Sequence, residues 1–110
     1  MNKVFKTKDS GKRAEFASGM VRDTEVAKAR YDLLDRSMLK RQAELMGRGA
    51  EKYGERNWEK ADSQEELNRF HASAFRHFMQ WIEGEVDEDH AAAVLFNIAA
   101  AEMVKGKIEG

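Results

Sequence analysis

The chain of 110 residues contains neither cysteine nor proline. Without cysteine it has no disulfide framework and no thiolate metal site. It has no apolar run near the roughly 20 residues of a membrane-spanning helix, and residues 1–20 lack the apolar segment of a signal peptide. We therefore expect a cytoplasmic protein without a membrane partner.

The chain also has no large excess of charge of either sign, because it contains 19 basic and 20 acidic residues and its formal net charge is −1. A protein that binds duplex nucleic acid usually presents a basic surface, so we expect no duplex partner. The basic residues that do gather in the first 22 positions are Lys3, Lys6, Lys8, Lys12, Arg13 and Arg22. They are typical either of a solvated tail or of an arm that contacts phosphates.

What the chain has in quantity is large apolar side chains, with two tryptophans, six phenylalanines and six methionines beside 35% charged residues. A single domain of this size buries only about 65% of the surface that its unfolded chain exposes. One subunit therefore cannot bury all of its apolar side chains in its own core. We expect a homo-oligomer.

Helical periodicity dominates from about residue 36 onward. The first predicted helix carries an apolar stripe of Leu39, Ala43, Met46, Ala50 and Tyr53, and it ends at the turn residues Gly54 and Asn57. Ser63 and Glu66 have the spacing of a capping box and predict the start of a second helix. Its predicted buried face is Leu67, Phe70, Ala74, Phe78, Trp81 and Ile82, and Gly84 ends it.

A third helix follows, capped by Asp87 or Asp89, with an alanine-rich body over 91–104. Short connections predict an all-α fold, a small antiparallel bundle of three main helices completed by oligomerisation. Residues 1–24 show no period, so we expect an extended arm there and a helical nucleotide-binding domain over 25–110. A short helix is also expected near residues 24–29.

Three polar residues fall where the second and third helices would face each other. His77 continues an apolar stripe, Asn97 is the one polar side chain between Ala91 and Ala101, and His90 precedes Asn97 by seven residues on the same face. A buried amide or imidazole needs partners. The pattern fits a wet pocket between helices or a hydrogen-bonded core network.

The segment between these helices is strongly acidic. It holds Glu83, Glu85, Asp87, Glu88 and Asp89. Crowded carboxylates repel one another unless a cation relieves them, and Mg²⁺ prefers carboxylate and phosphate oxygens. The alternative is a solvated loop that caps a helix.

The end of the first helix gathers a second set of candidates. Glu44 and Glu51 flank its apolar stripe, and Lys52, Tyr53 and Trp58 follow within one short segment. A lysine can bind phosphate, and an aromatic ring can stack on a base. For Trp58 the alternative is a position in the hydrophobic core.

Several of these pieces occur in one order: 18–24 (SGMVRDT), 30–34 (RYDLL), 49–58 (GAEKYGERNW), Arg76-His77, Gly84-Glu85, Asp87 and His90. In this the chain resembles the phage-encoded dATP/dGTP diphosphohydrolase N-terminal domain family, relatives of the MazG-like all-α nucleotide pyrophosphatases. The resemblance covers about residues 18–104.

The resemblance implies a helical dimer or tetramer that binds purine deoxynucleoside triphosphates with Mg²⁺ or Mn²⁺ and releases a monophosphate and pyrophosphate. The residues expected to act in catalysis are Glu51, Glu85 and His90. The expected metal ligands are Glu44, Glu51, Glu85, Asp87 and Asp89. The expected substrate contacts are Arg22, Arg30, Lys52, Tyr53, Asn57, Trp58, Arg76, His77 and Asn97.

One departure from the MazG-like pattern favours a different function. Those proteins place metal ligands on an ExxE helix, whereas Glu44 and Glu51 are seven residues apart. The alternative is a non-catalytic phage protein that sequesters a nucleotide or a cyclic nucleotide immune signal.

Overall fold

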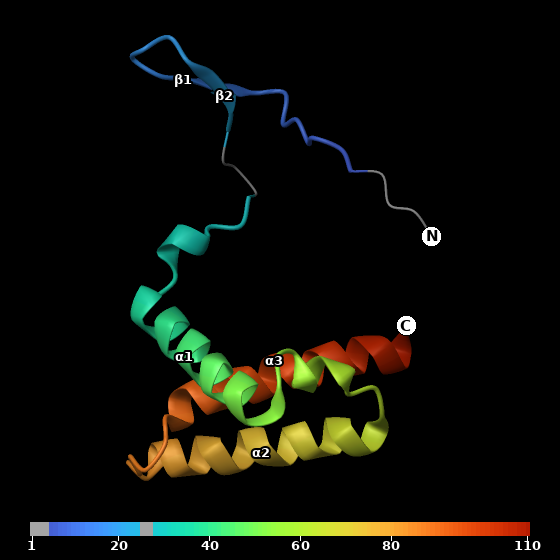
Figure 1. Cartoon of the computed structure of the whole chain (residues 1–110). Coiled ribbons are helices and arrows are strands. Elements are labelled where there is room, and N and C mark those ends of the chain that lie inside the picture. The colour runs from blue at the N-terminus through green and yellow to red at the C-terminus, as the bar shows by residue number, and fades with distance from the viewer. Residues whose placement is uncertain (1–4, 25–27) are drawn as a thin grey trace. The chain divides into compact units, whose positions relative to one another are not determined.

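The computed structural model describes residues 5–24 and 28–110. By its internal contacts the chain forms two units, residues 1–34 and 35–110, whereas the sequence places a boundary after residue 24. Figure 1 shows the elements of each.

The N-terminal unit contains a small antiparallel hairpin of β1 (Arg13–Glu15) and β2 (Val21–Asp23), followed by the 3-10 helix η1 (Tyr31–Leu33). The hairpin differs from the expected extended arm, because strands of three residues are too short to give a period in the sequence. The short helix expected near 24–29 includes residues 25–27, which lie outside the described residues.

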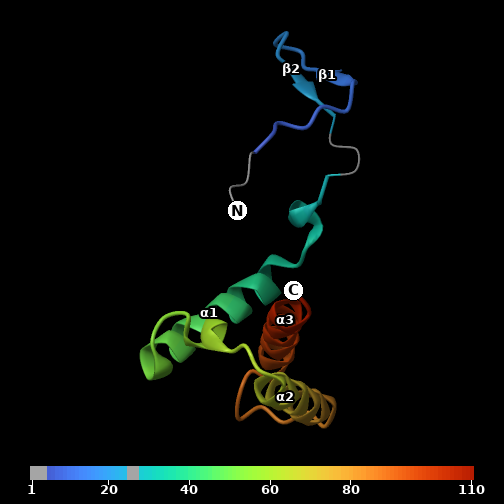
Figure 2. The same ribbon diagram turned by 90° about the vertical axis from the view of Figure 1, so that its right-hand side faces the viewer.

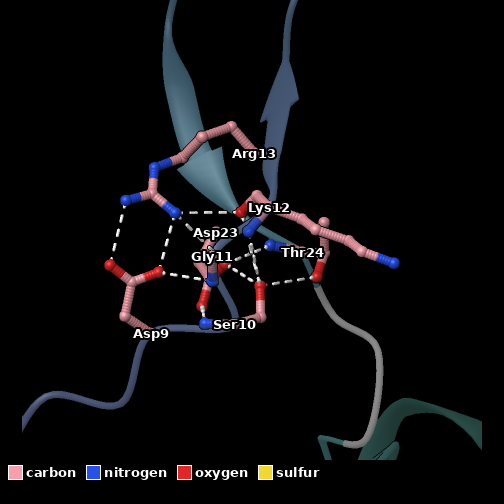
Figure 3. Close-up of polar contacts among 7 residues, drawn as sticks. All are labelled: Asp9, Ser10, Gly11, Lys12, Arg13, Asp23 and Thr24. Atoms are coloured by element: carbon pink, nitrogen blue, oxygen red, sulfur yellow. Dashed lines mark hydrogen bonds and ion pairs between the residues drawn. The ribbon is translucent and has the colours of Figure 1, made fainter.

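Polar contacts join the hairpin to the segment before it (Figure 3). The Asp23 carboxylate accepts hydrogen bonds from the backbone N–H of Ser10 at 2.9 Å and from the Ser10 hydroxyl. The Arg13 guanidinium donates to both carboxylate oxygens of Asp9 at 2.8 and 3.0 Å. Side-chain contacts therefore supplement the few backbone pairs of this hairpin.

The helical unit contains α1 (Arg36–Tyr53), the 3-10 helix η2 (Asn57–Lys60), α2 (Gln64–Ile82) and α3 (His90–Glu109). The predicted all-α class with three main helices is confirmed. The predicted capping box is also confirmed, because the Ser63 side chain accepts from the Glu66 N–H and the Glu66 side chain returns to the backbone of Ser63. Of the two candidate caps for the third helix, Asp89 occupies the position.

Helix α3 is the central element, since both α2 and α1 pack against it. Within this bundle the antiparallel pair is α2 and α3, which lie side by side, and α1 crosses α3 (Figures 1 and 2). The 3-10 turn η2 intervenes between α1 and α2, and it packs on α3 itself. The buried core cluster consists of Ala61, Leu67, Ala101 and Val104, with Phe70 and Met103 packed against it.

The predicted buried faces are correct only in part. On α2, Leu67 is buried, but Phe78, Trp81 and Ile82 are 42, 52 and 60% exposed. On α1, Leu39 and Tyr53 are exposed as well. Periodicity identifies an apolar stripe, but α3 alone cannot cover the full length of both stripes within one chain.

The last turn of α3 is held to the connection between α1 and α2. The Lys107 ammonium donates to the backbone carbonyls of Glu59 and Ala61, the latter at 3.1 Å. These carbonyls lie at the end of η2, the turn that carries Trp58. Across the described residues, no helix combines the length and apolar character that a membrane crossing requires.

Candidate functional site

Two adjoining cavities on the helical unit share part of their lining, and we refer to the two together as the groove. The first has a volume of about 490 Å³ and lies at the end of α1, η2 and the middle of α3. The second has a volume of about 610 Å³ and lies against the loop that precedes α3. Four residues line both cavities: Leu45, Arg48, Glu88 and Phe96. We call the first cavity the aromatic end of the groove and the second the acidic end.

Aromatic rings and cations line the aromatic end. Phe96 lies edge-on to Trp58 and to Phe70, with ring centroids 5.9 and 6.3 Å apart. The Lys52 ammonium lies 5.1 Å from the centre of the Tyr53 ring. Tyr53 is 61% exposed, so its ring is available to a ligand. An aromatic wall beside cationic side chains suits a nucleotide, whose base stacks and whose phosphates are anionic.

A chain of polar contacts lies behind the acidic end. The Nδ1 atoms of His77 on α2 and His90 on α3 are 2.8 Å apart, and His90 Nε2 is 2.7 Å from an Asp87 carboxylate oxygen. His90 is 2% exposed and His77 is 9% exposed. Two buried imidazoles and one carboxylate therefore form a connected network.

The charges near this network act on it in opposite directions. Burial lowers the pKa of His77, the neighbouring Arg76 lowers it further, and Glu88 opposes the shift. The hydrogen bond from His90 lowers the pKa of Asp87. At neutral pH the arrangement is therefore an uncharged His77 beside an ionised Asp87.

Glu88 completes a group with metal-binding character. One ligand atom each from His77, Glu88 and His90 lies within 4.8 Å of the other two, the one such group of three or more His, Asp or Glu found over residues 5–24 and 28–110. Glu88 is exposed, whereas both histidines are buried. Nitrogen and oxygen donors of this kind suit a divalent cation.

Asp89 has a different setting from its neighbours in the acidic loop. Its two carboxylate oxygens accept from Arg41 Nη2 and Nε at 2.7 and 2.8 Å, and one of them also accepts from the Ala92 N–H at 3.1 Å. The Arg41 contact lowers the pKa of Asp89 to about 2. Asp89 thus joins α1 to the start of α3.

The residues expected from the sequence fall into three groups. Those at the aromatic end are Lys52, Tyr53, Asn57 and Trp58. Those at the acidic end are His77, Asp87, Asp89 and Asn97, with His90 in contact with His77 and Asp87. Those that line neither end are Glu44, Glu51, Glu85 and Arg76.

The two remaining candidates, Arg22 and Arg30, belong to the N-terminal unit, where they line a separate cavity of about 450 Å³. Arg30 donates to both carboxylate oxygens of Asp32 at 2.9 and 2.7 Å. Asn97 donates to the Ala93 carbonyl of its own helix at 2.8 Å, which satisfies part of the hydrogen-bonding need of a buried amide.

The sequence predicted a site role for none of the four residues that line both cavities: Leu45, Arg48, Glu88 and Phe96. Glu88 was one of five carboxylates in the acidic loop, and nothing in its spacing separated it from Glu85. After the turn at Gly84, where φ is +77°, Glu88 lines both cavities and Glu85 lines neither.

A family model described as dATP/dGTP diphosphohydrolase, N-terminal, matches residues 18–109. The chain belongs to this family. The match spans every residue that lines the groove and confirms the resemblance seen in the sequence. It supports a nucleotide hydrolase as the general class. No significant match was found among curated proteins or among solved structures.

Proposed function

We propose that this protein is a phage-encoded, metal-dependent nucleotide pyrophosphohydrolase that converts a purine deoxynucleoside triphosphate to the monophosphate and pyrophosphate. The observation that carries the proposal is the shared lining of the two cavities, in which Arg48 and Glu88 border both the aromatic and the acidic end. The name of the family, which specifies dATP and dGTP, supports the substrate class.

The aromatic end suits the base and the cations suit the phosphates. Tyr53 is exposed beside Lys52, and Trp58 lies edge-on to Phe96 within the same wall. Stacking on such rings tolerates either purine, because every base has a π-face. Arg48 lies between the two ends and would meet the phosphate chain with a planar, permanently charged guanidinium.

The acidic end fits Mg²⁺ or Mn²⁺ by the chemistry of its donors. Asp87 and Glu88 both line it, and Asp87 is held ionised by its contact with His90. A bound ion would offset phosphate charge and lower the pKa of a water molecule beside it. Hydrolysis breaks the bond between the α and β phosphates, and water supplies the new oxygen on the α phosphate. Glu88 would accept the proton that this water loses, since both ring nitrogens of His90 already contact His77 and Asp87.

The test is an assay of purified protein with each dNTP and NTP in the presence of Mg²⁺ or Mn²⁺, with products separated by chromatography. We expect monophosphate and pyrophosphate to appear selectively from dATP or dGTP. Glu88→Gln should reduce turnover by at least 100-fold, and Glu83→Gln is the matched control in the same loop. A folded protein without turnover on any of these substrates would contradict the proposal.

One observation favours a second candidate, a protein that binds a nucleotide without cleaving it. Three of the carboxylates expected to hold metal in an active relative, Glu44, Glu51 and Glu85, line neither end of the groove. A sequestering protein would retain an intact nucleotide or cyclic nucleotide over hours, and Glu88→Gln would leave its affinity unchanged.

We also propose that the chain forms a homo-oligomer, a dimer or a tetramer. The last two turns of α2 expose several large apolar side chains: Phe75, Phe78, Met79, Trp81 and Ile82. Phe75 is 69% exposed and Ile82 is 60% exposed. An apolar surface of this extent on a small protein usually marks an interface.

A further inference from the structure

The two buried histidines face each other through the same ring atom. His77 Nδ1 and His90 Nδ1 are 2.8 Å apart, although they come from α2 and α3 and are 13 residues apart in sequence. The Glu88 carboxylate lies beside them, with all three ligand atoms within 4.8 Å. Three donor atoms from two helices and a loop thus lie close to one another.

The contact with Asp87 fixes the tautomer of His90. An ionised carboxylate can only accept a hydrogen bond, so the proton of a neutral His90 ring must be on Nε2, which is 2.7 Å from Asp87. Its Nδ1 therefore carries a lone pair that points at His77. A carboxylate on the far nitrogen of a ring is the usual partner of a histidine that binds metal.

The network is also complete without metal, because His77 Nδ1–H can donate to the lone pair of His90. A neutral imidazole can carry its proton on either ring nitrogen, so the proton of His77 needs only to move to Nε2 for both Nδ1 atoms to become ligands. Metal–imidazole bonds of about 2.0–2.1 Å at a tetrahedral angle place two nitrogens about 3.3–3.4 Å apart. From the observed 2.8 Å the two rings would have to separate by about 0.5 Å and turn so that both lone pairs face the ion.

We propose that His77, His90 and one carboxylate oxygen of Glu88 bind a divalent transition-metal ion, with Asp87 as the outer partner of His90 and the second Glu88 oxygen left to accept the proton from water. Imidazole nitrogen favours Mn²⁺, Co²⁺, Ni²⁺ or Zn²⁺ over Mg²⁺, which prefers oxygen. The inference rests on the proposed function only for the role of the ion in hydrolysis, since binding itself requires no nucleotide.

The test is a titration of metal-stripped, full-length protein with Co²⁺, followed by visible absorption and by calorimetry. We expect one Co²⁺ per chain with absorption bands from nitrogen ligands, and no displacement by a tenfold excess of Mg²⁺. His77→Gln and Glu88→Gln should weaken binding at least tenfold, and so should Asp87→Asn through the outer shell. His71→Gln and Glu83→Gln are matched controls at exposed positions outside the group.

The failure of this site and the failure of the proposed function give different results. A folded wild-type protein that binds no Co²⁺, or a His77→Gln variant that binds it as tightly as wild type, would overturn the site. Glu88 is exposed, so Glu88→Gln tests the site without disturbing the core, and unchanged affinity would also overturn it. Hydrolysis of dNTPs with Mg²⁺ alone by a protein that binds no Co²⁺ would remove this site and leave the function standing. Binding of Co²⁺ without hydrolysis of any of these nucleotides would leave the metal site standing and contradict the proposed function.

Discussion

Arg41 on α1 donates hydrogen bonds to both carboxylate oxygens of Asp89, the residue that caps α3. The distances are 2.7 Å from Nη2 and 2.8 Å from Nε. The pair links two helices whose residues are 48 positions apart. Asp89 also lines the acidic end of the groove, so the pair sets the position of one wall. A bidentate guanidinium–carboxylate contact is among the more directional polar contacts in proteins.

Substitution of Asp89 should separate its two roles. Asparagine is a good N-cap, so Asp89→Asn keeps the cap and removes only the charge; we expect a loss of about 1 kcal/mol in the free energy of unfolding. Asp89→Ala removes both contributions and should cost about 2 kcal/mol. Urea unfolding followed by circular dichroism measures both values. Equal losses for the two variants would show that the cap contributes nothing beyond the Arg41 contact, whereas no loss for Asp89→Asn would show that the Arg41 contact contributes nothing beyond the cap.

Low pH should weaken the contact between Arg41 and Asp89 over a defined pH range. The pKa of Asp89 is lowered from 3.8 to about 2, mainly by the hydrogen bond from Arg41. A carboxyl with a lowered pKa in the folded state contributes stability above its unfolded pKa and loses that contribution as the pH falls toward its folded pKa. The stability difference between wild type and Asp89→Asn should therefore be constant above about pH 5 and shrink between about pH 4 and pH 2. Thermal melts across this range check it, and a pH-independent difference would contradict it.

Removal of the exposed Tyr53 ring should weaken purine binding without affecting the core. Base–aromatic stacking contributes about 1–3 kcal/mol, so Tyr53→Ala should raise the Kd for dATP or dGTP about tenfold. Calorimetry with Ca²⁺ in place of the catalytic ion would measure binding without turnover. Tyr31→Ala, at another exposed tyrosine that does not line the groove, is the matched control. Equal effects of the two variants would place the base elsewhere.

Charge introduced on the apolar end of α2 should dissociate the proposed oligomer. Phe75 and Ile82 are exposed in the single chain, so Phe75→Glu and Ile82→Glu should leave the helical content unchanged while shifting the mass toward that of one chain. Analytical ultracentrifugation measures the mass, and Glu65→Gln on the same helix is a neutral control. A wild-type protein with the mass of one chain would contradict the oligomer itself.

The helix boundaries were predictable because local chemistry sets them. Gly54 at φ +92° ends α1, and the Ser63–Glu66 capping box begins α2, as their residue types indicate. The hairpin of β1 and β2 was not predictable from period, since each strand has three residues. The exposure of Trp81 and Ile82 was not predictable either, because an apolar stripe does not say what covers it.

The sequence predicted which kinds of residue form the candidate site, but it did not predict how they are arranged in space. The sequence indicated that His77, His90 and Asn97 face a common region, but it gave no basis to choose Glu88 over Glu85 or to separate Asp89 from Asp87. Those choices depend on the path of the loop after Gly84 and on Arg41, which is 48 residues away from its partner. Such long-range pairing leaves no local pattern in a single sequence.

Because Lys107 contacts the end of η2, the length of α3 sets the distance between that turn and His90. Its first turn carries His90, its last turn holds the segment that follows Trp58, and the 20 residues of the helix span about 30 Å. A single inserted residue in its middle would rotate one end relative to the other by about 100°, so His90 and Lys107 could not both keep their partners. The number of residues between His90 and Lys107 is therefore constrained as well as their identities.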